Sequence, residues 1–110
     1  MNSSYFPRPA LLILLLCLTW TEKKTEAAET VKVMTFNIRY ASAFGANSWP
    51  KRQAGVVQVI CERKPDIIGT QEGLHHQLLY MDKELTEYKW IGVGREGGKR
   101  GEFMAIFYRS

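Results

Sequence analysis

A strand–helix–strand pattern limits the folds open to this sequence more than any other property. Residues 31–40 (VKVMTFNIRY) are rich in β-branched and aromatic residues and predict a strand, apolar on both faces as if covered on both sides. Apolar residues at helical spacing predict a helix over 51–63, which ends before Pro65. Residues 66–72 (DIIGTQE) predict a second strand. Two strands joined by a helix pair in parallel, so we expect an α/β domain with helices packed on a sheet.

The second half of the sequence extends this pattern. An apolar stripe predicts a second helix, and residues 88–94 and 102–108 predict two further strands around a glycine-rich loop. The helix residues expected to face the core are Val56, Val57, Ile60, Leu74, Leu78, Met81 and Leu85. A charged fraction of 24% is typical of a globular protein, and a net charge of +4 is too small to indicate nucleic acid binding.

The N-terminal segment is predicted to lie outside this domain. Its apolar run, residues 10–20, would rise only about 16 Å as a helix, which is short against a hydrocarbon core of about 30 Å. The run fits the apolar region of a signal peptide, so we predict a signal peptide over 1–28, a domain over 29–110, and export to the periplasm or cell exterior. A buried helix and a short membrane anchor are the alternatives. Cys61, the domain's one cysteine, is expected to be buried and unreactive.

Two polar residues fall at the ends of the first two predicted strands. Asn37 lies near the end of the first, and Glu72 closes the second. Ligands of open α/β sheets bind beyond the carboxyl ends of the strands, so parallel pairing would bring these side chains together. A carboxylate and an amide oxygen suit Mg²⁺ or Ca²⁺ better than zinc. The structural alternative is that Asn37 serves a turn and Glu72 caps the next helix, and spacing alone favours it.

Five strings occur in a recognisable order: MTFNIRY, NSWPKR, KPDIIGTQEGL, YKWIGVGREGGKRGE and AIFY. Together they resemble the N-terminal part of the endonuclease/exonuclease/phosphatase superfamily, in particular its bacterial secreted branch. The resemblance covers residues 31–110. It implies the N-terminal portion of a four-layer α/β sandwich of two packed sheets. It also implies a metal-dependent phosphoester hydrolase that uses Mg²⁺, with Mn²⁺ or Ca²⁺ as alternatives.

The resemblance also implies roles for individual residues. Glu72 matches the metal-binding glutamate of the superfamily. Asn37 matches the asparagine that organises the metal and the phosphate, and Gln71 matches a supporting neighbour. We therefore expect Asn37 and Glu72 to be both catalytic and metal-binding.

Three further residues belong to strings that are typical of this branch. The resemblance implies phosphate or substrate contacts for Arg39, Arg95 and Glu102. For the two arginines, the alternative is a solvated or ion-paired side chain. For Glu102, the alternative is a structural hydrogen bond at the start of the last strand.

A histidine–aspartate pair activates water in this superfamily, but it comes from a later part of the sequence and has no counterpart here. His75 and His76 are adjacent, so on a helix they point about 100° apart, and we expect both at the surface. We therefore expect an inactive N-terminal fragment of a hydrolase, with a non-catalytic truncated relative or a binding module as the alternative. Nucleic acid, phospholipid head groups, inositol phosphates and sugar phosphates all stay open as substrates, and we infer no stable protein partner.

A glycine pattern before the last predicted strand resembles a dinucleotide-binding motif. Gly92, Gly94 and Gly97 spell G-x-G-x-x-G. A dinucleotide site needs a helix to begin there, because its N-terminus binds the pyrophosphate. A strand pattern follows instead, so we predict a hairpin loop.

Overall fold

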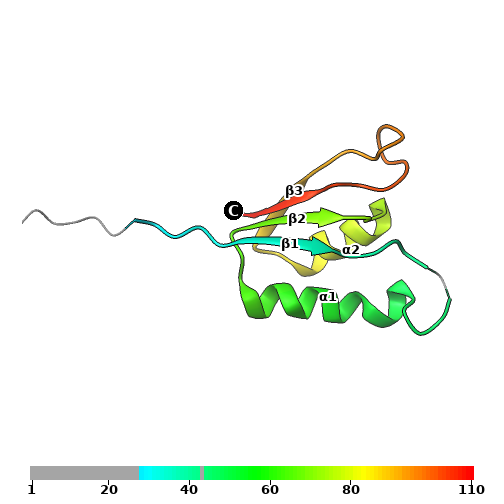
Figure 1. Cartoon of the computed structure of the whole chain (residues 1–110), viewed down its shortest axis with the longest axis horizontal. Coiled ribbons are helices and arrows are strands. Elements are labelled where there is room, and N and C mark those ends of the chain that lie inside the picture. The colour runs from blue at the N-terminus through cyan, green and yellow to red at the C-terminus, as the bar shows by residue number, and fades with distance from the viewer. Residues whose placement is uncertain (1–27, 43) are drawn as a thin grey trace, which may run out of the picture.

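The computed structural model describes residues 28–42 and 44–110 (Figure 1). These residues form the elements β1 (Val33–Asn37), α1 (Trp49–Arg63), β2 (Ile67–Gln71), α2 (His75–Glu84), β3 (Tyr88–Ile91) and β4 (Ile106–Arg109). Each predicted helix and strand is present, and the strands are shorter than predicted. None of the helices in this part of the chain is long and apolar enough to cross a membrane. The predicted signal peptide lies outside the described residues, apart from its last residue.

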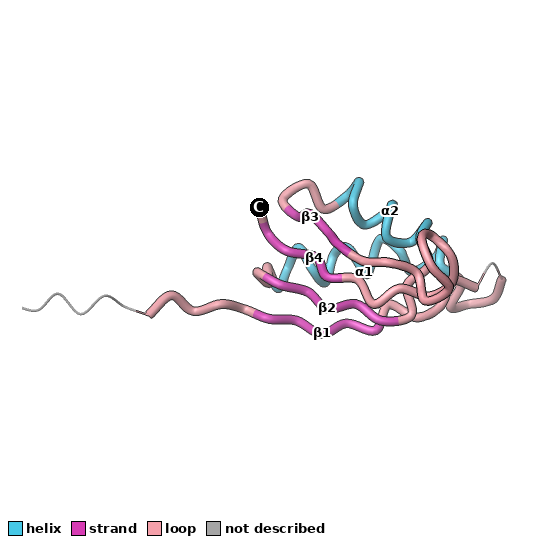
Figure 2. Tube along the Cα trace, turned by 90° about the horizontal axis from the view of Figure 1, so that it is seen from above, coloured by secondary structure: helices cyan, strands magenta, loops and turns pink. Residues whose placement is uncertain are grey.

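The four strands form one mixed sheet in the order β1-β2-β4-β3, which Figure 2 shows from above. β1 and β2 are parallel, as the strand–helix–strand pattern predicts, and Asn37 pairs with Gln71. β4 is antiparallel to both of its neighbours. The predicted mixed α/β class is therefore confirmed. The described residues form a single sheet, so the second sheet of a four-layer sandwich stays a prediction.

The helix ends follow local chemistry. α1 begins after Ser48, and Pro50 occupies its first turn, where no backbone donor is needed. It ends at Arg63, and Lys64 caps it by adopting a left-handed conformation (φ 49°) and donating its N–H to the carbonyl of Ile60. α2 begins after Leu74, whose N–H donates to the side-chain oxygen of Gln77 at 2.8 Å.

One face of the sheet carries the core. Predicted core residues that are buried there are Val56, Ile60, Leu78, Met81 and Leu85, whereas Val57 and Leu74 are half-buried. The expectation that Cys61 is buried was wrong, because its side chain is exposed. Ile60 is fully buried, and successive residues of a helix point about 100° apart, so Cys61 turns away from the core.

The other face of the sheet is exposed in the described part of the chain. Val33 is 71% exposed, Ile106 44% and Tyr108 36%. Val33 and Tyr108 both pair with Ile67, and Ile106 lies two residues before Tyr108 on the same strand. In the described residues, the first strand is covered on one face only, because both helices contribute their buried side chains to that face. Cover of the outer face, like the second sheet, stays a prediction.

Candidate functional site

The carboxyl ends of β1 and β2 bring together two polar side chains that are 35 residues apart in the sequence. Asn37 is the last residue of β1, and Glu72 follows β2 directly. The side-chain amide of Asn37 donates to Glu72 Oε1 at 2.7 Å. The expected proximity is thus present, whereas the catalytic and metal-binding roles of the two residues stay predictions.

The backbone after β1 turns back onto this pair. The N–H of Arg39 donates to Asn37 Oδ1 at 2.8 Å, and the N–H of Tyr40 donates to Glu72 Oε2 at 3.3 Å. Arg39 and Glu72 both adopt left-handed backbone conformations, with φ of 57° and 61°. Such conformations cost about 1–3 kcal/mol each in residues other than glycine, so the surrounding contacts must hold them in place.

These contacts favour the ionised form of Glu72. The hydrogen bond from Asn37 is the main cause that lowers the pKa of the Glu72 carboxyl, and the N–H of Tyr40 and the charge of Arg39 add to it. Partial desolvation acts in the opposite direction. The group is therefore a carboxylate at neutral pH, which is the form that binds a cation.

Replacing Asn37 with alanine should raise the pKa of Glu72 towards its usual value of 4.5, because the largest cause of the shift is removed. A carboxyl whose pKa is lower in the folded state stabilises the fold above its unfolded pKa, and this stability is lost as pH falls through the folded value. Wild-type protein should therefore lose more stability than N37A on acidification below pH 4.5. An NMR titration of the Glu72 carboxyl carbon measures the pKa directly.

Asn47→Ala is the matched control, because Asn47 is exposed and lies in the loop before α1. Its Glu72 titration should coincide with that of wild-type protein. An N37A titration that also coincides with wild type would show that the contact with Asn37 does not form in solution.

The donor atoms fit a hard divalent cation. Each Glu72 oxygen accepts one hydrogen bond and keeps a second lone pair, and the carboxylate faces solvent. Asn37 adds an amide oxygen, although that oxygen already accepts the N–H of Arg39. In the described residues, no group of three or more His, Cys, Asp and Glu side chains is placed to hold a metal. Glu72 and Asn37 would thus fill only part of a Mg²⁺ coordination shell, which takes six ligands near 2.1 Å.

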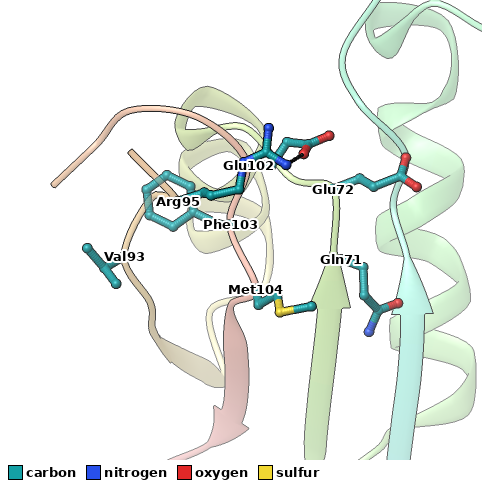
Figure 3. A pocket seen from close by; sticks show the side chains of 7 residues that line it. All are labelled: Gln71, Glu72, Val93, Arg95, Glu102, Phe103 and Met104. Atoms are coloured by element: carbon teal, nitrogen blue, oxygen red, sulfur yellow. Dashed lines mark ion pairs between the residues drawn. The ribbon is translucent and has the colours of Figure 1, made fainter. Parts of the chain in front are cut away.

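An open cavity of about 470 Å³ lies beside Glu72 (Figure 3). Its lining residues are Gln71, Glu72, Val93, Arg95, Glu102, Phe103 and Met104. Arg95 Nη1 and Glu102 Oε2 form an ion pair at 3.0 Å, and the Arg95 side chain is 70% exposed. Figure 3 shows the Glu72 carboxylate turned towards β1, away from this ion pair. The structure thus places Arg95 and Glu102 on the cavity. Arg39 is not among the lining residues, but its charge acts on Glu72.

The glycine-rich segment between β3 and β4 forms the predicted loop. Backbone hydrogen bonds close it from Gly94 N to Gly98 O at 2.8 Å and from Arg95 N to Glu102 O at 2.9 Å. No helix begins after Gly97, so the described residues lack the element that a dinucleotide site requires. The loop instead holds Arg95 and Glu102 opposite each other.

The two histidines differ in exposure. His76 is exposed, as expected. His75 is half-buried, with its ring 5.8 Å from that of Phe103 and 6.3 Å from that of Trp90. Gln71, the expected supporting residue, donates to Thr35 Oγ1 across the two parallel strands.

Two contributors to the site could not be identified from the sequence. Tyr40 acts through its backbone N–H, and a backbone donor leaves no signal in the residue type. Gln77 donates its side-chain amide to the carbonyl of Arg39 at 2.9 Å. Its spacing from Leu74 is that of a helix cap, which indicates the cap but not this second contact.

A scan against models of protein families finds no match, and a search of curated proteins finds none either. Solved structures do match. An endonuclease/exonuclease/phosphatase from Bacteroides vulgatus is 43% identical over 73% of this chain, with a TM-score of 0.70. A family protein from Bacteroides thetaiotaomicron is 38% identical over 73%, with a TM-score of 0.69. A mannosyl-6-phosphatase from the same organism is 38% identical over 74%, with a TM-score of 0.68.

The matched region spans about a third of the length of these proteins, at 31%, 31% and 32%. The comparisons confirm the resemblance that the ordered strings indicate, and they confirm the fold class.

Proposed function

We propose that this chain, which resembles the N-terminal third of endonuclease/exonuclease/phosphatase proteins, supplies the first part of the active site of a metal-dependent phosphoester hydrolase. The observation that carries the proposal is the contact between Asn37 and Glu72 at the ends of two parallel strands. Glu72 binds the divalent cation, and Asn37 orients its carboxylate. Mg²⁺ is the proposed cation, with Mn²⁺ or Ca²⁺ as substitutes.

The side chains around this pair suit a phosphate. When bound, the cation polarises the phosphoryl oxygens and neutralises charge that develops on them. Arg39 lies close enough to Glu72 to favour its ionised form, so its guanidinium can also meet an anion there. Arg95 lines the cavity beside Glu72, and its ion pair with Glu102 restrains its guanidinium. A phosphate beside Glu72 could therefore meet the positive charges of both Arg39 and Arg95.

Hydrolysis also requires a base that activates water. In the described residues, His75 packs against Phe103, and His76 lies in a shallow depression formed with Ser42 and Trp49. Neither histidine forms a pair with an aspartate there. We therefore propose that the base comes from residues outside this part of the protein, and that the described part alone does not turn over substrate.

The proposed substrate is a phosphomonoester of a sugar. The similarity to a mannosyl-6-phosphatase supports this class, and the open cavity beside Glu72 has room for the alcohol part of such a substrate. From the sequence alone, we also propose that residues 1–28 direct export to the periplasm or cell exterior.

Replacing Glu72 with glutamine should abolish binding of Mn²⁺ to the full chain, because it removes the anionic ligand and keeps the shape of the side chain. The relaxation rate of water protons, measured as Mn²⁺ is titrated into the protein, reports this binding. Glu84→Gln is the matched control, since Glu84 is an exposed glutamate at the end of α2, and this variant should bind Mn²⁺ as wild type does.

Two results would contradict the proposal. Equal Mn²⁺ binding by E72Q and wild type would show that the cation does not use Glu72. The absence of binding by wild type would favour the non-catalytic relative or binding module.

A further inference from the structure

One arginine in the first turn of α1 binds several backbone carbonyls of the loop that follows β1. Arg52 is half-buried, and its guanidinium lies over the ring of Trp49, 5.1 Å from the ring centre. All its hydrogen bonds go to backbone carbonyl oxygens, those of Asn47 (2.9 Å), Arg39 (2.8 Å), Tyr40 (3.2 Å) and Ile38. Among the described residues, no carboxylate pairs with it. Its five N–H donors in a planar fork are what make these simultaneous contacts feasible.

The carbonyls that Arg52 holds are joined through planar peptide bonds to the donors of the candidate site. The carbonyl of Ile38 and the N–H of Arg39 belong to one peptide plane, and that N–H donates to Asn37. The carbonyl of Arg39 and the N–H of Tyr40 belong to the next plane, and that N–H donates to Glu72. Because a trans peptide is rigid, fixing the carbonyl oxygen also fixes the direction of the N–H on the opposite side.

A second side chain holds only one of these planes. Gln77 is fully buried and donates to the carbonyl of Arg39 at 2.9 Å, while its oxygen caps α2. Among the described residues, the carbonyl of Arg39 thus has two side-chain donors, and that of Ile38 has one, Arg52. These contacts also offset the cost of the left-handed conformation of Arg39.

We infer that Arg52 is the positioning residue of the candidate metal site: by anchoring two consecutive peptide planes, it aims one N–H at Asn37 and the next at Glu72. Gln77 supports the second plane only. Arg52 touches neither carboxylate oxygen and acts through the backbone. The consequence for metal binding rests on the proposed function, whereas the anchoring of the two planes is a property of the fold.

Arg52→Lys tests this inference, because lysine keeps the charge and the length but cannot span several carbonyls. The amides of Arg39 and Tyr40 should exchange with solvent faster and shift in ¹⁵N NMR spectra, while the amides of β2 and β4 keep their wild-type behaviour. The affinity for Mn²⁺ should fall about tenfold, as is usual when a residue that orients a metal ligand is lost. Arg63→Lys, an exposed position in the last turn of α1, is the matched control.

Gln77→Glu tests the two peptide planes independently, because Gln77 contacts only the second of them. The carboxylate keeps an oxygen for the N–H of Leu74 but removes the donor to the carbonyl of Arg39. At pH 8, the amide of Tyr40 should therefore exchange with solvent faster than in wild type. The amide of Arg39 should keep its wild-type exchange rate. This variant keeps the inference testable if R52K does not fold.

The outcomes also separate this inference from the proposed function. Wild-type exchange at Tyr40 and Arg39 in R52K would overturn the positioning role, even if E72Q abolishes Mn²⁺ binding. A thermal destabilisation of R52K without any change at these amides would overturn it too, since the role would then be structural. Failure of wild type to bind Mn²⁺ would overturn the proposed function and leave the amide result interpretable.

Discussion

Replacing Phe107 with alanine should abolish the cooperative folding of this chain. Phe107 is fully buried in β4, pairs with Ile68 on one side and Trp90 on the other, and stacks on the Trp90 ring at 6.1 Å. Truncating such a residue costs about 3–5 kcal/mol. A single domain is stable by only about 5–15 kcal/mol. A small domain whose sheet buries one face, as in the described residues, falls at the low end of that range, where the loss approaches the whole stability.

Tyr108→Ala is the matched control, because Tyr108 is the next residue of β4 and points to the exposed face. Urea unfolding followed by circular dichroism should show a cooperative transition for Y108A at a midpoint close to that of wild type, and none for F107A. Equal losses for the two variants would show that the outer face of the sheet is also packed in solution.

Replacing Gly94 with alanine should disrupt the loop that carries Arg95 and Glu102. A Cβ at Gly94 would lie 1.9 Å from the carbonyl oxygen of Arg100 and 2.7 Å from its carbonyl carbon. These are backbone atoms, so no change of side-chain rotamer relieves the overlap. Forced overpacking of this kind typically costs about 1–3 kcal/mol, and here the loop has to open.

The expected signs in G94A are a lower melting temperature and altered amide shifts at Arg95 and Glu102, whose backbone hydrogen bond closes the loop. Gly98→Ala is the control, because Gly98 has φ of 56° and open space around its Cβ position. That variant should pay only the cost of a left-handed alanine, about 1 kcal/mol. Identical spectra of G94A and wild type would show that the loop is not closed as described.

The site was predictable in part because its two central residues follow from strand order. Parallel pairing of β1 and β2 places the ends of both strands at one edge, so Asn37 and Glu72 had to be neighbours once the crossover helix was recognised. Their hydrogen bond then follows from side-chain chemistry. The positions of Arg39, Arg95 and Glu102 depend on the conformations of loops. Loop conformations leave no periodic pattern in the sequence from which they could be predicted.

The contacts that hold the site together were not predictable. Arg52 appears in the sequence as one more charged residue of an exposed-looking helix start, and only the folded loop offers it several carbonyl oxygens. Backbone acceptors carry no residue signature, and the left-handed conformations of Arg39 and Glu72 occur at residue types that rarely adopt them.

The sequence alone thus sets the types and order of the helices and strands. Apolar periodicity, the proline at 65 and the capping residues each act over only a few residues, so their effects can be predicted locally. The insertion of β4 between β2 and β3, and the division of the sheet into a buried and an exposed face, arise only in the tertiary structure. Strand order minimises the free energy of the whole packed sheet, and pairings between distant residues contribute to that energy without leaving a local pattern.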